Sequence, residues 1–160
     1  MSSATTTAAQ PLMTAEEFLK QYGDELNVDL VDGRVEYQPM PHRRHGTICN
    51  NVSFALTGFV RPNRLGRVMI NDTFVTLDPP PELVFEVRSP SNTWAALVQK
   101  ALDYLNAGVN VVVLIDADVE SASVYRLNEV QQVFHNGDEF TLPDVLPGFA
   151  VPVRQFFADD

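Results

Sequence analysis

The sequence predicts an α+β fold in which helices flank a mixed β-sheet. An early turn signal between two alternating apolar segments indicates a hairpin. Two later segments carry apolar residues three or four positions apart, which is typical of amphipathic helices. Segments rich in β-branched and aromatic residues lie between and after them. The resulting order is hairpin, helix, strands, helix and strands.

The chain is expected to begin with a disordered tail, residues 1–12, followed by a single domain over residues 13–158. The tail lacks the basic and apolar regions of a signal peptide. In the segment TAEEFLKQY, Thr14 and Glu17 have the spacing of a capping box, which predicts a short helix. The dipeptide Asp32-Gly33 then predicts a hairpin in LNVDLVDGRVEYQ.

The middle of the chain is predicted to form one long helix and several strands. Ile48, Val52, Leu56 and Phe59 would share one face of a helix over residues 42–60. Strands are expected at residues 65–72, 73–78 and 83–87, where the first two form two strands or one bent strand.

A second helix and the remaining strands complete the pattern. The helix is predicted over residues 94–107, with Gly108 placed as a left-handed C-terminal cap. Its inward residues would be Trp94, Leu97, Val98, Ala101 and Leu105. The apolar run at residues 109–116 predicts a central strand covered on both faces. Further strands are expected at 122–127 and 131–135, a turn at Asn136-Gly137, and a C-terminal segment that packs Phe149, Phe156 and Phe157.

The charge balance limits the partners of the protein. Eleven Lys and Arg residues against 21 Asp and Glu residues give a net charge of −10, which excludes binding of nucleic acid through the overall field. Any contact with DNA must be local. No apolar run reaches the roughly 18 residues of a membrane span, so no membrane partner is expected. Cys49 is the single cysteine, which excludes an intramolecular disulfide and fits the cytoplasm.

Glu86 is unusual because it interrupts the strand-like segment VFEVRSP. An unpaired carboxylate costs several kcal/mol when buried, so such acids are usually paired or bound to a metal. Lys100 lies 14 residues later on the predicted helix, and this spacing lets it return to Glu86. A structural acid paired with Arg88 or Lys100 is the alternative. For Lys100, the alternative is a surface lysine that pairs with Asp103 or lies over Tyr104.

These residues stand within a longer pattern. ELVFEVRSPSNTWAALVQKALDYLNAGV, together with VDLVDGRV, PHRRHG, LGRV and LPGF, resembles the Uma-type family of restriction endonucleases in the PD-(D/E)XK nuclease superfamily. The resemblance covers nearly the whole chain after the tail. It implies a restriction-endonuclease-like core and hydrolysis of phosphodiester bonds in DNA that depends on Mg²⁺ or Mn²⁺.

The resemblance also implies roles for individual residues. Glu86 matches an acid that is both catalytic and a metal ligand, and Lys100 matches the catalytic lysine. Asp29 stands where the family usually has a glutamate in its first hairpin. His45 matches a histidine at the start of the helix, and Arg44 beside it belongs to a basic patch suited to phosphate. Asp29 as an exposed hairpin residue and His45 as a capping or core residue remain alternatives.

One part of the family pattern is missing. Family members usually carry a further strand that opens with Pro-Asp, and its aspartate is the other main metal ligand. Here only a link near residues 78–82 remains, so the domain is internally shortened. Asp78 is the candidate replacement and Asp72 a second one, whereas Glu82 matches a structural acid. The shortening would also uncover a sheet edge or apolar patch, which predicts a homodimer.

Two functions follow from this pattern. The first is an endonuclease that uses Glu86, Lys100 and Asp29. The second is a catalytically inactive relative that serves as a binding or dimerisation module.

Overall fold

The computed structural model describes residues 12–25, 28–31, 33–37, 43–70, 79–89 and 92–159. The chain forms two compact units, Met1–Met40 and Pro41–Asp160, which are described separately. Most of the expected tail, residues 1–11, lies outside the described residues. The single domain over residues 13–158 stays a prediction.

The first unit contains a short helix and a hairpin. Helix α1 (Ala15–Tyr22) begins with the predicted capping box, because Thr14 Oγ1 accepts a hydrogen bond from Glu17 N at 3.2 Å and a Glu17 carboxylate oxygen accepts one from Thr14 N at 2.8 Å. Strands β1 (Val28–Val31) and β2 (Arg34–Tyr37) pair in antiparallel fashion. Gly33 in their turn has a φ of +75°, which only glycine adopts readily. The predicted helix and hairpin are confirmed.

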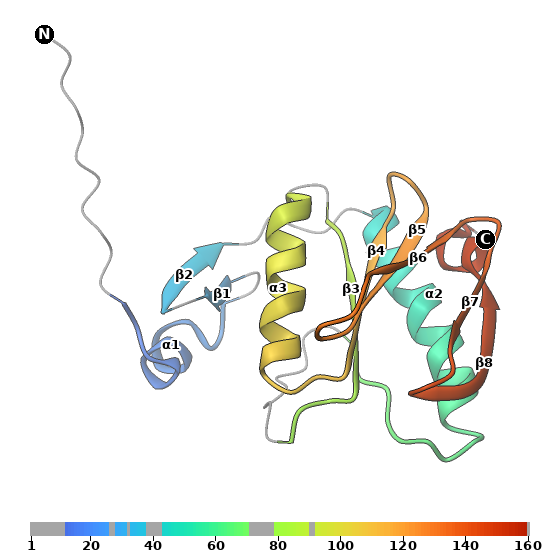
Figure 1. Ribbon diagram of the computed structural model, residues 1–160. Helices are drawn as coiled ribbons and strands as arrows, with labels where there is room; N and C mark the ends of the chain where they lie inside the picture. The colour runs from blue at the N-terminus through green and yellow to red at the C-terminus, as the bar shows by residue number, and fades with distance from the viewer. Residues whose placement is uncertain are drawn as a thin grey trace, which may run out of the picture. The chain divides into compact units, whose positions relative to one another are not determined.

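The second unit is built around a four-stranded sheet (Figure 1). Its strands are β3 (Leu83–Val87), β4 (Val111–Asp116), β5 (Ser121–Tyr125) and β6 (Gln132–His135), in that order across the sheet. Strand β3 runs parallel to β4, whereas β5 and β6 continue in antiparallel fashion. The predicted mixed sheet is therefore confirmed, with β4 as an inner strand.

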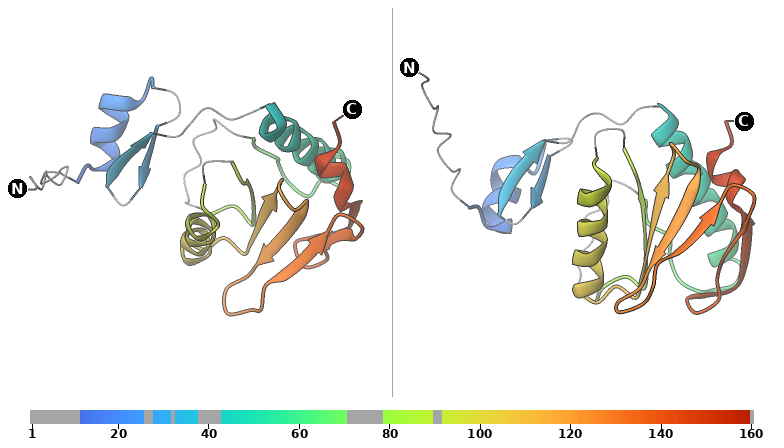
Figure 2. Two further views of the ribbon diagram at one scale, coloured as in Figure 1. Left: turned by 90° about the horizontal axis from the view of Figure 1, so that it is seen from above. Right: turned by 45° about the horizontal axis from the view of Figure 1, so that its top comes forward.

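Two helices cover opposite faces of this sheet (Figure 2). Val111, Val113 and Ile115 of β4 pack in the cluster that contains α2 (Arg43–Val60). Val112 and Leu114 pack against α3 (Trp94–Asn106). Because side chains alternate along a strand, one strand serves both layers. All six residues of β4 are buried, as predicted. In the part of the chain that the structure describes, no helix is long and apolar enough to cross a membrane.

The C-terminal residues add a separate two-stranded sheet. Strands β7 (Glu139–Leu142) and β8 (Leu146–Pro152) pair in antiparallel fashion, and a 3₁₀ helix, η1 (Val153–Phe157), follows. Phe140 is fully buried among aromatic rings from β3, β6, β8 and η1, with ring centroids 5.1 to 6.4 Å apart. The predicted burial of Phe149, Phe156 and Phe157 is confirmed.

The strand predicted at residues 65–72 is wrong for the part that can be checked. Residues 65–70 belong to no strand, and Met69 and Ile70 are 55% and 63% exposed. β-forming residues favour a strand only where a neighbouring strand completes the hydrogen bonds and a core takes the side chains. The rest of this prediction, and the strand at residues 73–78, lie outside the described residues.

Candidate functional site

Glu86 lies in the middle of β3, on the face of the sheet that α3 covers. Its neighbours Phe85 and Val87 pack into the cluster of α2, whereas Val84, two residues before Glu86, packs into the cluster of α3. The alternation of the strand therefore turns the Glu86 side chain toward α3.

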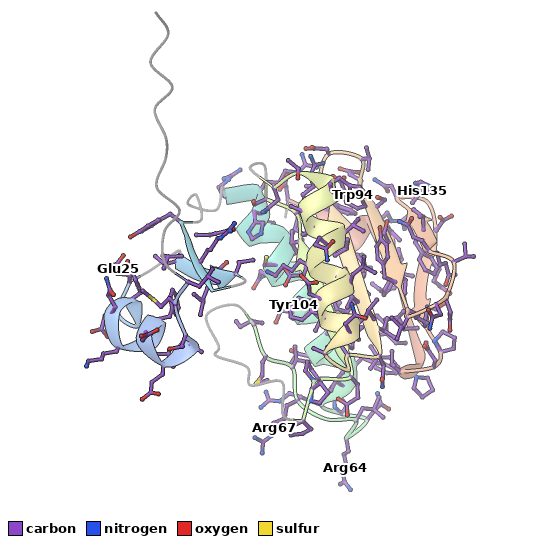
Figure 3. All side chains as sticks on the ribbon, turned by 60° about the vertical axis from the view of Figure 1, so that its left-hand side comes forward. Glu25, Arg64, Arg67, Trp94, Tyr104 and His135 are labelled. Carbon is purple, nitrogen blue, oxygen red and sulfur yellow. The ribbon has the colours of Figure 1, made fainter. Side chains whose placement is uncertain are left out.

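Helix α3 supplies two partners for the Glu86 carboxylate. Lys100 Nζ lies 3.1 Å from Glu86 Oε1, and Tyr104 Oη donates a hydrogen bond to the same oxygen at 3.0 Å. Figure 3 shows Tyr104 on α3, with Trp94 at the start of the helix. The predicted approach of Lys100 to Glu86 is confirmed, and the hydrogen bond from Tyr104 is a new finding.

The packing of α3 fixes this geometry. Thr93 caps the helix by accepting a hydrogen bond from Ala96 N at 3.2 Å, and the buried residues Leu97, Ala101 and Leu105 bind the helix to the sheet. Lys100 and Tyr104 are four residues apart, so both lie on the same flank. The Lys100 ammonium is 5.8 Å from the centre of the Tyr104 ring, within the range of a cation–π contact.

The ion pair is only half-buried. The Glu86 side chain is 20% exposed and that of Lys100 is 49% exposed. A pair at such exposure contributes about 0.2 to 1 kcal/mol to stability. Among the described residues, both contacts of the carboxylate fall on Oε1 and none on Oε2.

Other charged residues near the site are engaged elsewhere. Arg88 Nη1 lies 3.1 Å from Asp116 and 3.0 Å from Asp118, so it does not pair with Glu86. Asp103 accepts a hydrogen bond from Gln99 at 2.9 Å and does not pair with Lys100. The structural alternatives that remain are the ion pair between Glu86 and Lys100 and the position of Lys100 over Tyr104.

His45 and Arg44 lie at the start of α2, on the other face of the sheet. The Val87 carbonyl only accepts, so His45 Nε2 donates to it at 3.1 Å, and Cys49 Sγ lies 3.7 Å from Nδ1. Arg44 pairs with Glu120 at 2.9 Å, with half of its side chain exposed. His45 thus contacts the backbone next to Glu86 but not its carboxylate.

For the two remaining predicted site residues, Asp29 and Asp78, the structure gives no position relative to this group. Asp29 is exposed on β1 in the first unit and lies opposite Glu36 of β2. Asp78 lies outside the described residues, as does Asp72. Glu82, the structural acid of the family pattern, is exposed just before β3. The structure brings Glu86 and Lys100 together and adds Tyr104.

The second unit supplies few ligands for a divalent metal ion. Within the described ranges, no group of three or more His, Cys, Asp or Glu residues could hold a metal. Mg²⁺ is usually bound by one or two carboxylates together with waters and substrate phosphates. Glu86 alone meets the lower limit of that requirement.

The contact from Tyr104 was missed because its position also suits ordinary packing. The sequence places Tyr104 one helical turn after Lys100, and an aromatic residue there is expected to cover the lysine side chain. A polar hydroxyl on the face that also carries Lys100 was the available signal.

Comparisons with known proteins agree with this architecture. The profile of the Uma2 family, described as "Putative restriction endonuclease", matches residues 15–79 and 75–154. The crystal structure of "a putative nuclease belonging to DUF820" from Anabaena variabilis ATCC 29413 is similar, with a TM-score of 0.76 and 20% identity. The similarity covers 91% of this chain and 97% of that chain. No curated protein matches the sequence.

Proposed function

Because the chain belongs to the Uma2 family of restriction-endonuclease-like proteins, we propose that it hydrolyses phosphodiester bonds of DNA. The observation that carries this proposal is the contact between Glu86 and Lys100, 3.1 Å apart at the junction of β3 and α3. A carboxylate and an ammonium at this spacing suit a site that binds both a divalent cation and a phosphate.

Glu86 would hold Mg²⁺ or Mn²⁺ through its carboxylate, which Lys100 and Tyr104 contact. When bound, such an ion lowers the pKa of a water molecule and neutralises charge on the phosphate. Lys100 would stabilise the charge that develops on the phosphate oxygens. Tyr104 would orient the carboxylate. Asp78 is the proposed second metal ligand, and Asp29 remains a proposed catalytic acid of the first unit.

The basic start of α2 would contact DNA phosphates from the other face of the sheet, where His45 reaches the Val87 carbonyl next to Glu86. Arg44 is half-exposed and already paired with Glu120, so phosphate would compete with this acid for the guanidinium. His45 would contribute only through its position beside β3. With a net charge of −10 on the chain, this interaction should be weak and sensitive to salt.

A catalytically inactive binding module is the second candidate. The family match falls into two stretches that overlap at residues 75–79, which is the region where the sequence lacks the usual Pro-Asp strand. The described residues also offer only one carboxylate at the site. Both observations favour a relative that keeps the fold and has lost the second ligand.

Cleavage of supercoiled plasmid by the full chain separates the two functions. With Mg²⁺ or Mn²⁺ present, the nuclease should nick the plasmid, and Glu86→Gln should reduce the rate about a hundredfold or more, because the side chain keeps its shape but loses its charge. Glu82→Gln is the matched control, since it removes an exposed acid just before the same strand and should leave the rate unchanged.

The melting temperature gives a second readout. A metal ion that binds the native site should raise the melting temperature of the wild type but not that of Glu86→Gln. No metal-dependent cleavage and no such rise would favour the binding module. Cleavage that persists in Glu86→Gln would contradict the assignment of Glu86.

A further inference from the structure

The outer face of α2 carries an exposed aromatic residue between two glycines. Gly46, Asn50, Phe54 and Gly58 follow one another at intervals of four, so they lie on one side of the helix, and all are exposed. Phe54 is 80% exposed. The opposite side of the same helix carries Ile48, Val52, Leu56 and Val60, which are buried in the core. The helix therefore presents a second apolar feature away from its own core.

A groove lies beside this aromatic ring. It runs between α2 and the C-terminal residues of β8 and η1, which Figures 1 and 2 show next to each other, and has a volume of about 510 Å³. Phe54, Ala55 and Gly58 form one side, and Phe149 and Ala150 are on the other. Asn51 Nδ2 donates hydrogen bonds to the carbonyls of Phe156 and Ala158, at 3.3 and 2.8 Å, and so holds the two walls together.

Among the described residues, no packing contact explains the two glycines. A Cβ atom added at Gly46 or Gly58 would meet nothing within 4 Å. A helix is less stable with glycine than with alanine at an inner position. Helix stability therefore does not favour glycine at either position. The close approach of another surface to the helix backbone would supply one.

The α2 face and its groove carry no charged residues, which limits the kind of partner that can bind there. Residues 46–60 contain no Asp, Glu, Lys or Arg, and every residue that lines the groove is uncharged. A nucleic acid or a charged peptide would find no charged partner in the groove itself. Two copies of this chain, each with a net charge of −10, repel each other overall, and contact through an uncharged face adds the least local repulsion.

We propose that this face joins two copies of the chain, with Phe54 of each copy seated in the groove of the other. A twofold interface requires a surface that is complementary to itself, and a protruding ring next to a groove meets this condition. Helix α2 has 18 residues and is about 27 Å long, which sets the length of the contact. The proposal is independent of nuclease activity.

Sedimentation velocity of the full chain from about 5 to 200 μM, a range suited to weak association, tests this surface. The wild-type mass should rise from the single-chain value of 17.8 kDa toward twice that value. Phe54→Glu should keep the single-chain mass throughout, because two added charges would face each other in the interface. Val130→Glu is the matched control: Val130 is 96% exposed and lies outside α2 and the groove, so this variant should associate like the wild type.

Gly58→Gln separates loss of the interface from loss of the fold. Glutamine is a better helix former than glycine, and its Cβ would meet no described atom within 4 Å, so the melting temperature should stay or rise. The larger side chain would nevertheless obstruct the groove and raise the dissociation constant at least tenfold. Wild-type protein that stays a single chain, as it would if residues 1–40 or another protein cover this face, overturns the proposal. Association that survives in both Phe54→Glu and Gly58→Gln also overturns it.

Discussion

A single oxygen of Glu86 receives both of its described contacts, and sequence reasoning reached only one of them. The spacing between Glu86 and Lys100 predicted their approach, because a strand followed by a helix must return over the sheet. The hydroxyl of Tyr104 was not foreseen because an aromatic residue at that position suits packing equally well. Side-chain type at a helical spacing thus predicts proximity but not the atom that is contacted.

Arg126 and Asp144 give a residue-scale prediction about pH. Arg126 Nε and Nη2 donate to the two Asp144 oxygens at 2.8 and 2.7 Å, and this hydrogen bonding lowers the pKa of Asp144 from its usual 3.8. Asp144→Asn should lower the free energy of unfolding at pH 7 by about 0.2 to 1 kcal/mol, since the carboxylate is 45% exposed. Urea unfolding measures this difference.

The sign of the pH dependence follows from the direction of the shift. A lowered pKa in the folded state stabilises the protein above the usual value of 3.8, and the stabilisation is lost as the pH falls through the folded-state value. The difference between wild type and Asp144→Asn should therefore shrink below about pH 4. Glu139→Gln, which changes an exposed acid on β7, is the control. A difference that stays constant down to pH 3 would contradict the role of this pair.

Elements were predicted well where a repeating pattern coincided with a core. Helices α2 and α3, the inner strand β4 and the hairpin of β1 and β2 all carry such patterns and were found close to their predicted places. Residues 65–70 have the composition of a strand but belong to none, and Gly66 adopts a φ of +145°. The composition of a segment shows that it can form a strand, whereas strand pairing depends on distant parts of the chain.

The close packing of α3 on the sheet gives a prediction for one element. Ala101 is 0% exposed between the helix and β4, so there is no room for a larger side chain. Ala101→Leu should reduce the free energy of unfolding by about 1 to 3 kcal/mol, because overpacking forces the helix away from the sheet. Ala95→Leu on the exposed side of the same helix should change it by no more than about 0.5 kcal/mol. Equal losses in urea unfolding would show that α3 is not held at Ala101.

At the scale of the whole molecule, the sequence predicted the fold class better than the completeness of the site. Glu86, Lys100 and Tyr104 all come from residues 83–106, a continuous stretch whose geometry follows from local spacing. Asp29 belongs to a separate unit, and Asp78 lies outside the described residues. Joining such positions requires long-range contacts, which no local pattern encodes.

Alternate side chains of β4 belong to the two hydrophobic clusters. Neither α2 nor α3 can therefore detach without exposing one face of β4. Amide protons of β4 should therefore exchange with deuterium only when the whole second unit opens, at the slowest rate in the chain. Those of β1 and β2 should exchange much sooner, since a two-stranded hairpin is marginally stable by itself. Exchange followed by mass spectrometry measures both. If the β4 amides exchanged as fast as those of the edge strand β6, the two layers would be opening one at a time.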